Sequence, residues 1–250
     1  MKENRKNSLK RSLAVILFSI LICLGVFIPQ LTVSSGQAVT GSVQNMFAIL
    51  SGLILGGLQG AGAAGFFIIL GAAGLHVFPG KMAGMEYFLG PSGGYIWGYF
   101  FAALMGGMLL GNPYEYEKKF SLKHWLFIAG ISFLCYATVY LPGILWFRHS
   151  IVENTYPEKT QILYEYFSSL EKNQRLKELL KITFYPFLGE DIVKWIITVP
   201  LTAVIRPYAA KILYPSDRKE EEAIFEDMKK QKELIEKLRN IKKTGNKKKN

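Results

Sequence analysis

The chain has 250 residues, half of them hydrophobic, and its formal net charge is +11. The apolar residues gather in long runs, whereas the cations gather between the runs and at the two ends. This segregation excludes an ordinary soluble domain and favours a membrane protein. It also argues against nucleic acid as the partner of the basic residues.

Six apolar segments follow one another along the chain. A helix needs about 20 predominantly apolar residues to cross a bilayer. The segments cover about residues 12–28, 43–57, 60–78, 91–111, 123–147 and 187–214. The sequence therefore predicts an all-α membrane protein in which residues 12–214 form six transmembrane helices.

Both ends of the chain are basic. Residues 1–11 are rich in lysine and arginine, and nearly half of all lysines and arginines follow Ile205. The positive-inside rule therefore places both termini in the cytoplasm. Residues 215–250 form a charged tail, for which we expect a helix that rests on anionic lipid headgroups. A signal peptide cleaved after Ser34–Ala38 is the alternative for the first segment, but the five spans that follow favour retention.

The second segment opens with Gln44 and Asn45, whose amide groups could either cap a helix or contact a ligand. Glycines then recur every four residues, at Gly52, Gly56 and Gly60. Small residues at this spacing let membrane helices pack backbone to backbone. This stripe is expected to be structural.

A glycine-rich stretch, 71–98, joins the third and fourth segments. Within it, Gly80 and Lys81 resemble part of a phosphate-binding loop. The Walker pattern requires a glycine five residues before Gly80 and a serine or threonine after the lysine. Those positions hold Leu75 and Met82, so we expect no nucleotide hydrolysis by this chain.

Ser92, in the same stretch, could be the nucleophile of an intramembrane serine hydrolase. Such an enzyme needs a histidine within hydrogen-bonding reach of the serine. His124 is predicted at the opposite membrane face, while nothing in the sequence orients His76 or His149 toward Ser92. A hydrolase is therefore the less favoured function.

Residues 148–185 form a polar insert between the fifth and sixth segments. Its pattern over Gln161–Leu180 is typical of one amphipathic helix at the outer surface. The pair Pro142-Gly143, before the insert, is expected to kink or end the fifth helix.

Asp191 and Lys194 enter the sixth segment three residues apart, which places them on one helical face. A charge inside a span is costly and usually has a function. A carboxylate beside an ammonium suits a neutral polar group that has both donors and acceptors. The alternative is that the acidic residues only favour the positive end of a helix.

Several runs together resemble the BioY family, the biotin-specific S components (substrate-capture subunits) of energy-coupling-factor (ECF) transporters. The similar runs are Gly74–Phe78, Leu89–Tyr95, Pro186–Lys194, and Gln44 leading into Phe47–Gly56. The resemblance covers most of residues 39–111 and 184–214. It implies a six-helix protein of the cell membrane with an outward-facing pocket, no catalytic residue, no metal and no cofactor.

The resemblance also implies biotin as the ligand, with a coupling membrane subunit and two ATPase subunits as partners. Asp191 would accept a hydrogen bond from the ureido ring, and Lys194 would donate one to the ureido carbonyl. Gln44 or Asn45 would donate a second. An S component for another vitamin is the alternative within this class.

With biotin as the ligand, we also expect a mostly apolar wall and a site for the carboxylate. Phe78, Tyr87 and Tyr95 would surround the apolar ring and chain of biotin. The backbone of the glycine loop around Gly84, or the side chain of Lys81, would bind the carboxylate.

Overall fold

The computed structural model describes residues 2–28, 42–111, 113, 122–153, 157–214, 223, 226–231 and 233–235. Most of these residues are helical. The α-helices are α1 (Lys2–Leu24), α2 (Gln44–Leu55), α3 (Gly57–Ala72), α4 (Met85–Leu89), α5 (Gly93–Leu110), α6 (Leu122–Val152), α7 (Pro157–Ser169), α8 (Lys172–Thr183) and α9 (Tyr185–Leu213). Two 3₁₀ turns, Gly25–Phe27 and Pro79–Lys81, complete the elements of residues 2–214.

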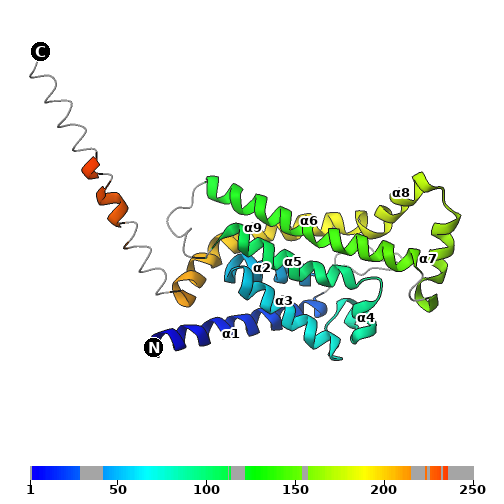
Figure 1. Ribbon diagram of the computed structural model, residues 1–250, viewed down its shortest axis with the longest axis horizontal. Coiled ribbons are helices and arrows are strands. Elements are labelled where there is room, and N and C mark those ends of the chain that lie inside the picture. Colours follow the sequence, from blue (N-terminus) through cyan, green and yellow to red (C-terminus); the bar gives the residue numbers. More distant parts are fainter. Residues whose placement is uncertain are drawn as a thin grey trace, which may run out of the picture.

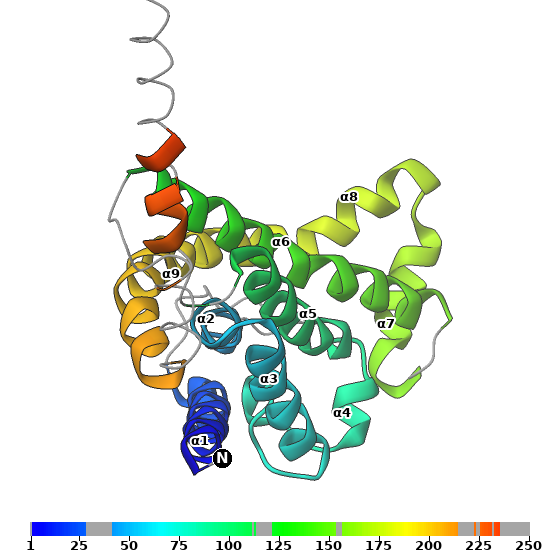
Figure 2. The ribbon, with the colours of Figure 1, turned by 60° about the vertical axis from the view of Figure 1, so that its left-hand side comes forward.

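The helices form a bundle around α2. This helix contacts α1, α3, α5, α6 and α9 (Figure 2). Eleven of its residues are buried, including the amide side chains at its start. Viewed from the side, α1 begins at one end of the bundle, while α4, α7 and α8 lie at the other (Figure 1). The bundle therefore has two distinct ends.

Four helices, α1, α5, α6 and α9, are long and apolar enough to cross a membrane. The second and third predicted spans correspond to α2 and α3, which are apolar but have only 12 and 16 residues. They join at Gly56, whose φ of 97° suits glycine but few other residues. Residues 73–78, expected in the third span, instead belong to the loop before α4.

Glycines bring the central helices into direct backbone contact. A Cβ atom added at Gly52 would lie 2.0 Å from the carbonyl oxygen of Ala103 in α5. One added at Gly60 would lie 2.3 Å from Cα of Gly52, and one at Gly107 would lie 2.1 Å from the amide nitrogen of Gly57. The prediction that this glycine stripe packs helices against one another is confirmed.

The end of α6 and the form of the insert differ from the predictions in part. α6 does not end at Pro142 but continues to Val152, because a proline removes one hydrogen bond from a 31-residue helix that packs along α5 and α9. The single helix expected over 161–180 is two helices, since the backbone is extended at Glu171. Of the charged tail, residue 223 and residues 226–231 and 233–235 are helical; the rest of the tail lies outside the described residues.

Candidate binding site

A pocket lies between α2, α5, α6 and α9, beside the loop that precedes α5. Its walls are mostly aromatic or aliphatic, with a few polar groups. The lining residues are Ser42, Asn45, Pro79, Tyr87, Ser92, Tyr95, Ile96, Tyr99, Val139, Tyr140, Phe187, Asp191 and Lys194. The open volume is about 40 Å³, enough for a few water molecules.

Asp191 is the centre of the polar part of the pocket. Its Oδ1 atom accepts hydrogen bonds from the Asn45 amide at 2.8 Å and from the Lys194 ammonium at 3.0 Å. Its Oδ2 atom accepts one from the Tyr140 hydroxyl at 2.5 Å. Three helices, α2, α6 and α9, thus meet at one buried carboxylate.

The Lys194 ammonium uses all of its donors within the protein. Besides Asp191, it contacts Glu190 Oε1 at 2.7 Å and donates to the carbonyl oxygen of Ser42 at 2.8 Å. An ammonium has three N–H bonds, so each of them has an acceptor. Glu190, Asp191 and Lys194 are all at most 8% exposed, which makes this a buried group of two carboxylates and one ammonium.

The position of Asp191 weakens the explanation by the helix dipole alone. α9 begins at Tyr185 and has no acidic residue in its first turn. The effect of the dipole falls off within that turn. The contacts of Glu190 and Asp191, rather than the dipole, therefore explain why these acidic side chains lie more than one turn into the helix.

Tyr95 and Tyr87 line the pocket, as expected, whereas Phe78 does not. The Tyr95 hydroxyl donates to the carbonyl oxygen of Thr183 at 2.8 Å, and its ring occupies the space where a Cβ of Gly143 would lie. Phe78 is fully buried and stacks on Tyr87 with ring centroids 5.7 Å apart. It supports the wall of the pocket from behind.

Gln44 does not line the pocket, contrary to expectation. Its amide nitrogen donates to the carbonyl oxygens of Ile22 at 2.9 Å and Val77 at 2.6 Å, and its side-chain oxygen accepts from the Ser42 hydroxyl. Both N–H bonds of the amide are thereby used. Gln44 ties α2 to the end of α1 and to the loop after α3.

Lys81 and Gly84 are also outside the lining. Lys81 is exposed, and its ammonium lies 5.4 Å from the ring centroid of Phe27. A Cβ at Gly84 would meet nothing within 4 Å, but its φ of 89° favours glycine. Its amide donates to the carbonyl oxygen of Gly71, so this glycine shapes the loop.

Several lining residues, Tyr99 and Tyr140 among them, are not in the set predicted from the sequence. Tyr136 and Tyr140 lie four residues apart in an apolar helix, and both hydroxyls face α9: that of Tyr136 is 2.9 Å from Thr198 Oγ1. Tyrosines at this spacing inside a span were a signal that a polar partner lay on another helix.

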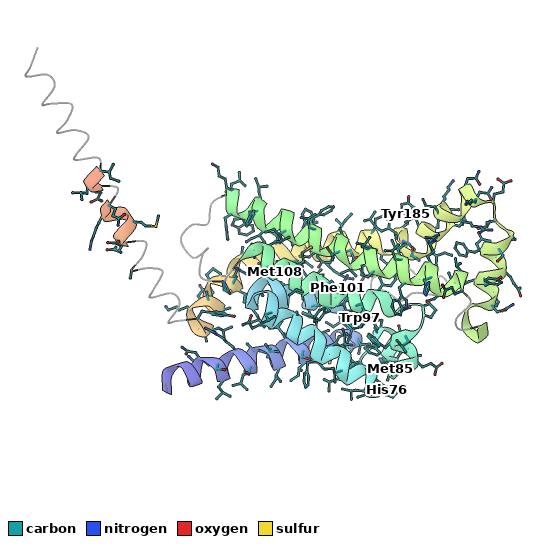
Figure 3. The ribbon with its side chains drawn as sticks, in the orientation of Figure 1. His76, Met85, Trp97, Phe101, Met108 and Tyr185 are labelled. Carbon is teal, nitrogen blue, oxygen red and sulfur yellow. The ribbon has the colours of Figure 1, made fainter. Side chains whose placement is uncertain are left out.

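The geometry gives the hydrolase alternative no support. Ser92 lines the pocket, but His124 is near the start of α6, at the opposite end of the bundle. His76 is exposed and lies with Met85 at the α4 end (Figure 3), while His149 contacts Glu153. Within the described residues, no group of three histidine, cysteine or acidic side chains could hold a metal.

The chain is similar to proteins of one family over most of its length. A model described as the BioY family matches residues 1–211. The chain is 27% identical over 181 residues to "Biotin transporter BioY" of Thermotoga maritima, covering 72% of this chain and 86% of that protein. It is 30% identical over 158 residues to "Probable biotin transporter BioY" of Methanothermobacter thermautotrophicus, covering 63% of this chain and 88% of that protein.

A solved structure agrees with the sequence comparisons. The crystal structure of the S-component for biotin from an ECF-type ABC transporter superposes with a TM-score of 0.59 and 25% sequence identity. The match covers 82% of this chain and 94% of the other.

Proposed function

This chain belongs to the BioY family, and from this premise we propose that it is the biotin-binding S component of an ECF-type importer. The observation that carries the proposal is the buried group around Asp191, which faces a pocket walled by tyrosines. Similarity to proteins named as biotin transporters supports the choice of ligand. A coupling membrane subunit and ATPase subunits would supply the energy for uptake.

The ureido ring of biotin presents two N–H donors and one carbonyl acceptor. A carboxylate has about four acceptor positions, and Asn45, Lys194 and Tyr140 occupy three of those on Asp191. We infer that the remaining one accepts from a ureido N–H. The carboxylate is thereby held in place by protein groups before the ligand arrives.

Lys194 must exchange a partner before it can donate to the ligand. Two of its acceptors are carboxylates and the third is the neutral carbonyl oxygen of Ser42. The ureido carbonyl is the closest chemical equivalent of that third acceptor. We infer that biotin replaces Ser42 at Lys194.

The pocket must also widen. Ligand pockets usually measure about 300–1,000 Å³, far above the open volume of about 40 Å³ seen here. Pro79, in a 3₁₀ turn, and Tyr87, in the short helix α4, lie between α3 and α5, outside the close glycine contacts of the central helices. Movement of these two residues would open the pocket with the least disturbance of the bundle.

Titration of the purified chain with biotin tests the proposal. Hydrogen bonds to charged groups contribute roughly 1.5–3 kcal/mol, so Asp191→Asn should weaken binding by about one to two orders of magnitude. Lys194→Ala should weaken it as well. Asp227→Asn makes the same chemical change at an exposed position and should leave the dissociation constant unchanged.

Two results would contradict the proposal. One is an unchanged dissociation constant for both pocket variants, measured on folded, monodisperse protein. The other is displacement of bound biotin by a different vitamin, such as riboflavin or thiamine, at lower concentration than biotin itself, which would favour an S component of another specificity.

A further inference from the structure

A second, larger cavity lies outside the pocket, in the insert. It is a groove of about 640 Å³ between the C-terminal part of α6 and the two helices of the insert. Figure 2 shows α7 and α8 standing beside that part of α6, away from α1, α2 and α3. Nothing in the proposed biotin site uses this groove.

Three cations line the groove: Arg148 from α6, and Lys172 and Arg175 from α8. None of its described lining residues is acidic. Arg175 is held in position, since its Nε donates to the carbonyl oxygen of Leu170 at 3.1 Å and its Nη2 to that of Ser168 at 3.3 Å. The remaining N–H bonds of its guanidinium are not used by these two contacts.

The acidic residue on the same helix, Glu178, has partners of its own. Lys181 donates to Glu178 Oε1 at 2.5 Å and the Tyr166 hydroxyl donates to Oε2 at 3.2 Å. The hydrogen bond from Lys181 lowers the pKa of Glu178, with a smaller contribution from Tyr166. The positive charge of the groove is thus not neutralised by this carboxylate.

The rest of the groove is mostly apolar and open to its surroundings. Leu145 is 56% exposed and Leu176 is 64% exposed, while Leu179 and Ile151 form the buried floor. On α6 the apolar surface continues from the groove toward the N-terminus of the helix, where Leu141 is 65% exposed. Such a surface, joined to three cations, suits an amphiphile with a negative head.

The length of α6 places the groove at the level of lipid headgroups. Its 31 residues span about 46 Å at ~1.5 Å per residue, whereas the hydrocarbon core of a bilayer is about 30 Å thick. With the start of α6 at one boundary of the hydrocarbon, its last turns, from Leu145 to Val152, extend beyond the other boundary at the α7–α8 end. Leu141 lies near its boundary.

We propose that this groove is a binding site for an anionic phospholipid of the adjacent leaflet. Arg148, Lys172 and Arg175 bind the phosphate of the headgroup, while Leu145 and Leu176 contact the glycerol and the first part of the acyl chains. The chains continue over Leu141 along α6. The insert thereby becomes a lipid-binding element, independent of which vitamin the pocket takes.

Binding of short-chain lipids to the full-length protein in neutral detergent tests this proposal. Native mass spectrometry or a fluorescent-lipid assay should show one saturable site for dioctanoyl phosphatidylglycerol and binding at least about tenfold weaker for dioctanoyl phosphatidylcholine. Each cation near a charged headgroup contributes on the order of a few-fold in affinity. Arg148→Gln combined with Lys172→Gln should therefore weaken phosphatidylglycerol binding about tenfold or more.

Matched variants separate the groove from general charge and hydrophobicity. Lys123→Gln with Lys177→Gln removes the same charge at exposed positions outside the lining and should leave lipid binding unchanged. Leu176→Ser should weaken binding, whereas Ile162→Ser, at a site 83% exposed and outside the lining, should not. All four changes are on exposed side chains, so the fold is retained.

Three outcomes would overturn the lipid site. They are equal affinity for the two lipids, equal loss in the groove and control variants, and displacement of the lipid by millimolar glycerol phosphate. The last would mean that the groove binds a free phosphate group with no need for acyl chains.

Discussion

Each N–H bond of the Lys194 ammonium already has an acceptor, and two of the three acceptors are carboxylates on its own helix. Burying charges is costly unless they are paired and hydrogen-bonded. The group around Asp191 meets this condition with partners from α2, α6 and α9. Single changes here should therefore affect both stability and binding, and the two effects have to be measured separately.

Tyr140→Phe is the sharpest test of the contacts around Asp191. It removes the hydroxyl that donates to Asp191 Oδ2 but keeps the ring, which packs edge-on against Phe184 with centroids 4.8 Å apart. The carboxylate loses one of the contacts that orient it, and we expect biotin affinity to fall about tenfold, or ~1.4 kcal/mol. Isothermal titration of the folded variant measures this.

Gln44→Ala serves as the control for the tyrosine variant. It removes buried hydrogen bonds to Ile22 and Val77 at a site outside the pocket lining. Its melting temperature should fall while its affinity for biotin stays within about threefold of the parent, or roughly 0.7 kcal/mol. If Gln44→Ala lost binding and Tyr140→Phe did not, the assignment of the two side chains would have to be reversed.

The short helix α2 ends with buried carbonyl groups that need hydrogen-bond donors, and α9 supplies them. A membrane helix as short as α2 ends where water cannot reach its last carbonyl groups. Arg206, which is 1% exposed, donates to the carbonyl oxygens of Leu53 and of Gly111, at the ends of α2 and α5. The Tyr214 hydroxyl donates to that of Leu55 at 2.7 Å. The C-terminal part of α9 and the residue that follows it thus cap two neighbouring helices.

Arg206→Met tests this capping. The substitution gives an unbranched apolar side chain and leaves three carbonyl oxygens, those of Leu53, Leu110 and Gly111, without their donor. The cost is about 3 kcal/mol at ~1 kcal/mol for each group. The melting temperature should fall by roughly 6–12 °C. Biotin affinity should be unchanged, because Arg206 lies about three helical turns from Lys194 along α9.

Lys211→Met is the matched control, since Lys211 is an exposed cation on the same helix. It should change the melting temperature by no more than about 2 °C, as surface substitutions usually stay within ±0.5 kcal/mol. Equal losses in the two variants would show that Arg206 contributes only charge, not capping.

Local pattern was enough to predict some elements and not others. The apolar runs predicted the four long helices, and the four-residue glycine spacing predicted close backbone packing of helices, but not that α5 is one of the partners. Asp191, Lys194 and Asn45 could be chosen because polar groups in spans are rare. Gln44 could not be separated from Asn45, because which of two adjacent amides faces the pocket depends on where α1 and the α3 loop lie.

Tertiary context also decided the ends of helices. Pro142 is a reliable signal for a helix end in isolation, but packing along α5 and α9 keeps α6 intact. The break at Glu171 lets α8 return to the start of α9, and no local sequence motif predicted it. Lys81 was chosen for its charge, and only the course of the loop shows that it points toward Phe27.

The molecule as a whole has one end with the N-terminus and one with the insert (Figure 1). The distribution of lysine and arginine predicts that the first end is cytoplasmic. The orientation of the pocket and of the lipid groove both depend on this prediction. Labelling of single cysteines tests it.

Ile162→Cys and Met228→Cys suit this purpose, since the native side chains are 83% and 52% exposed. The native cysteines, Cys23 and Cys135, are buried and free and are replaced by alanine. An impermeant maleimide added to intact cells should label position 162 and should label position 228 only after the membrane is opened. The reverse pattern would invert the proposed orientation.

The occupied donors of Lys194 have a consequence for the speed of binding. If biotin takes the place of Ser42, the bond between Lys194 and the Ser42 carbonyl has to break first, whatever the ligand concentration. A site that opens before it fills shows an association rate that levels off as ligand is added, at the rate of opening. At high biotin concentration the rate of capture is then limited by the opening of the site, and at low concentration by the rate at which biotin meets the protein.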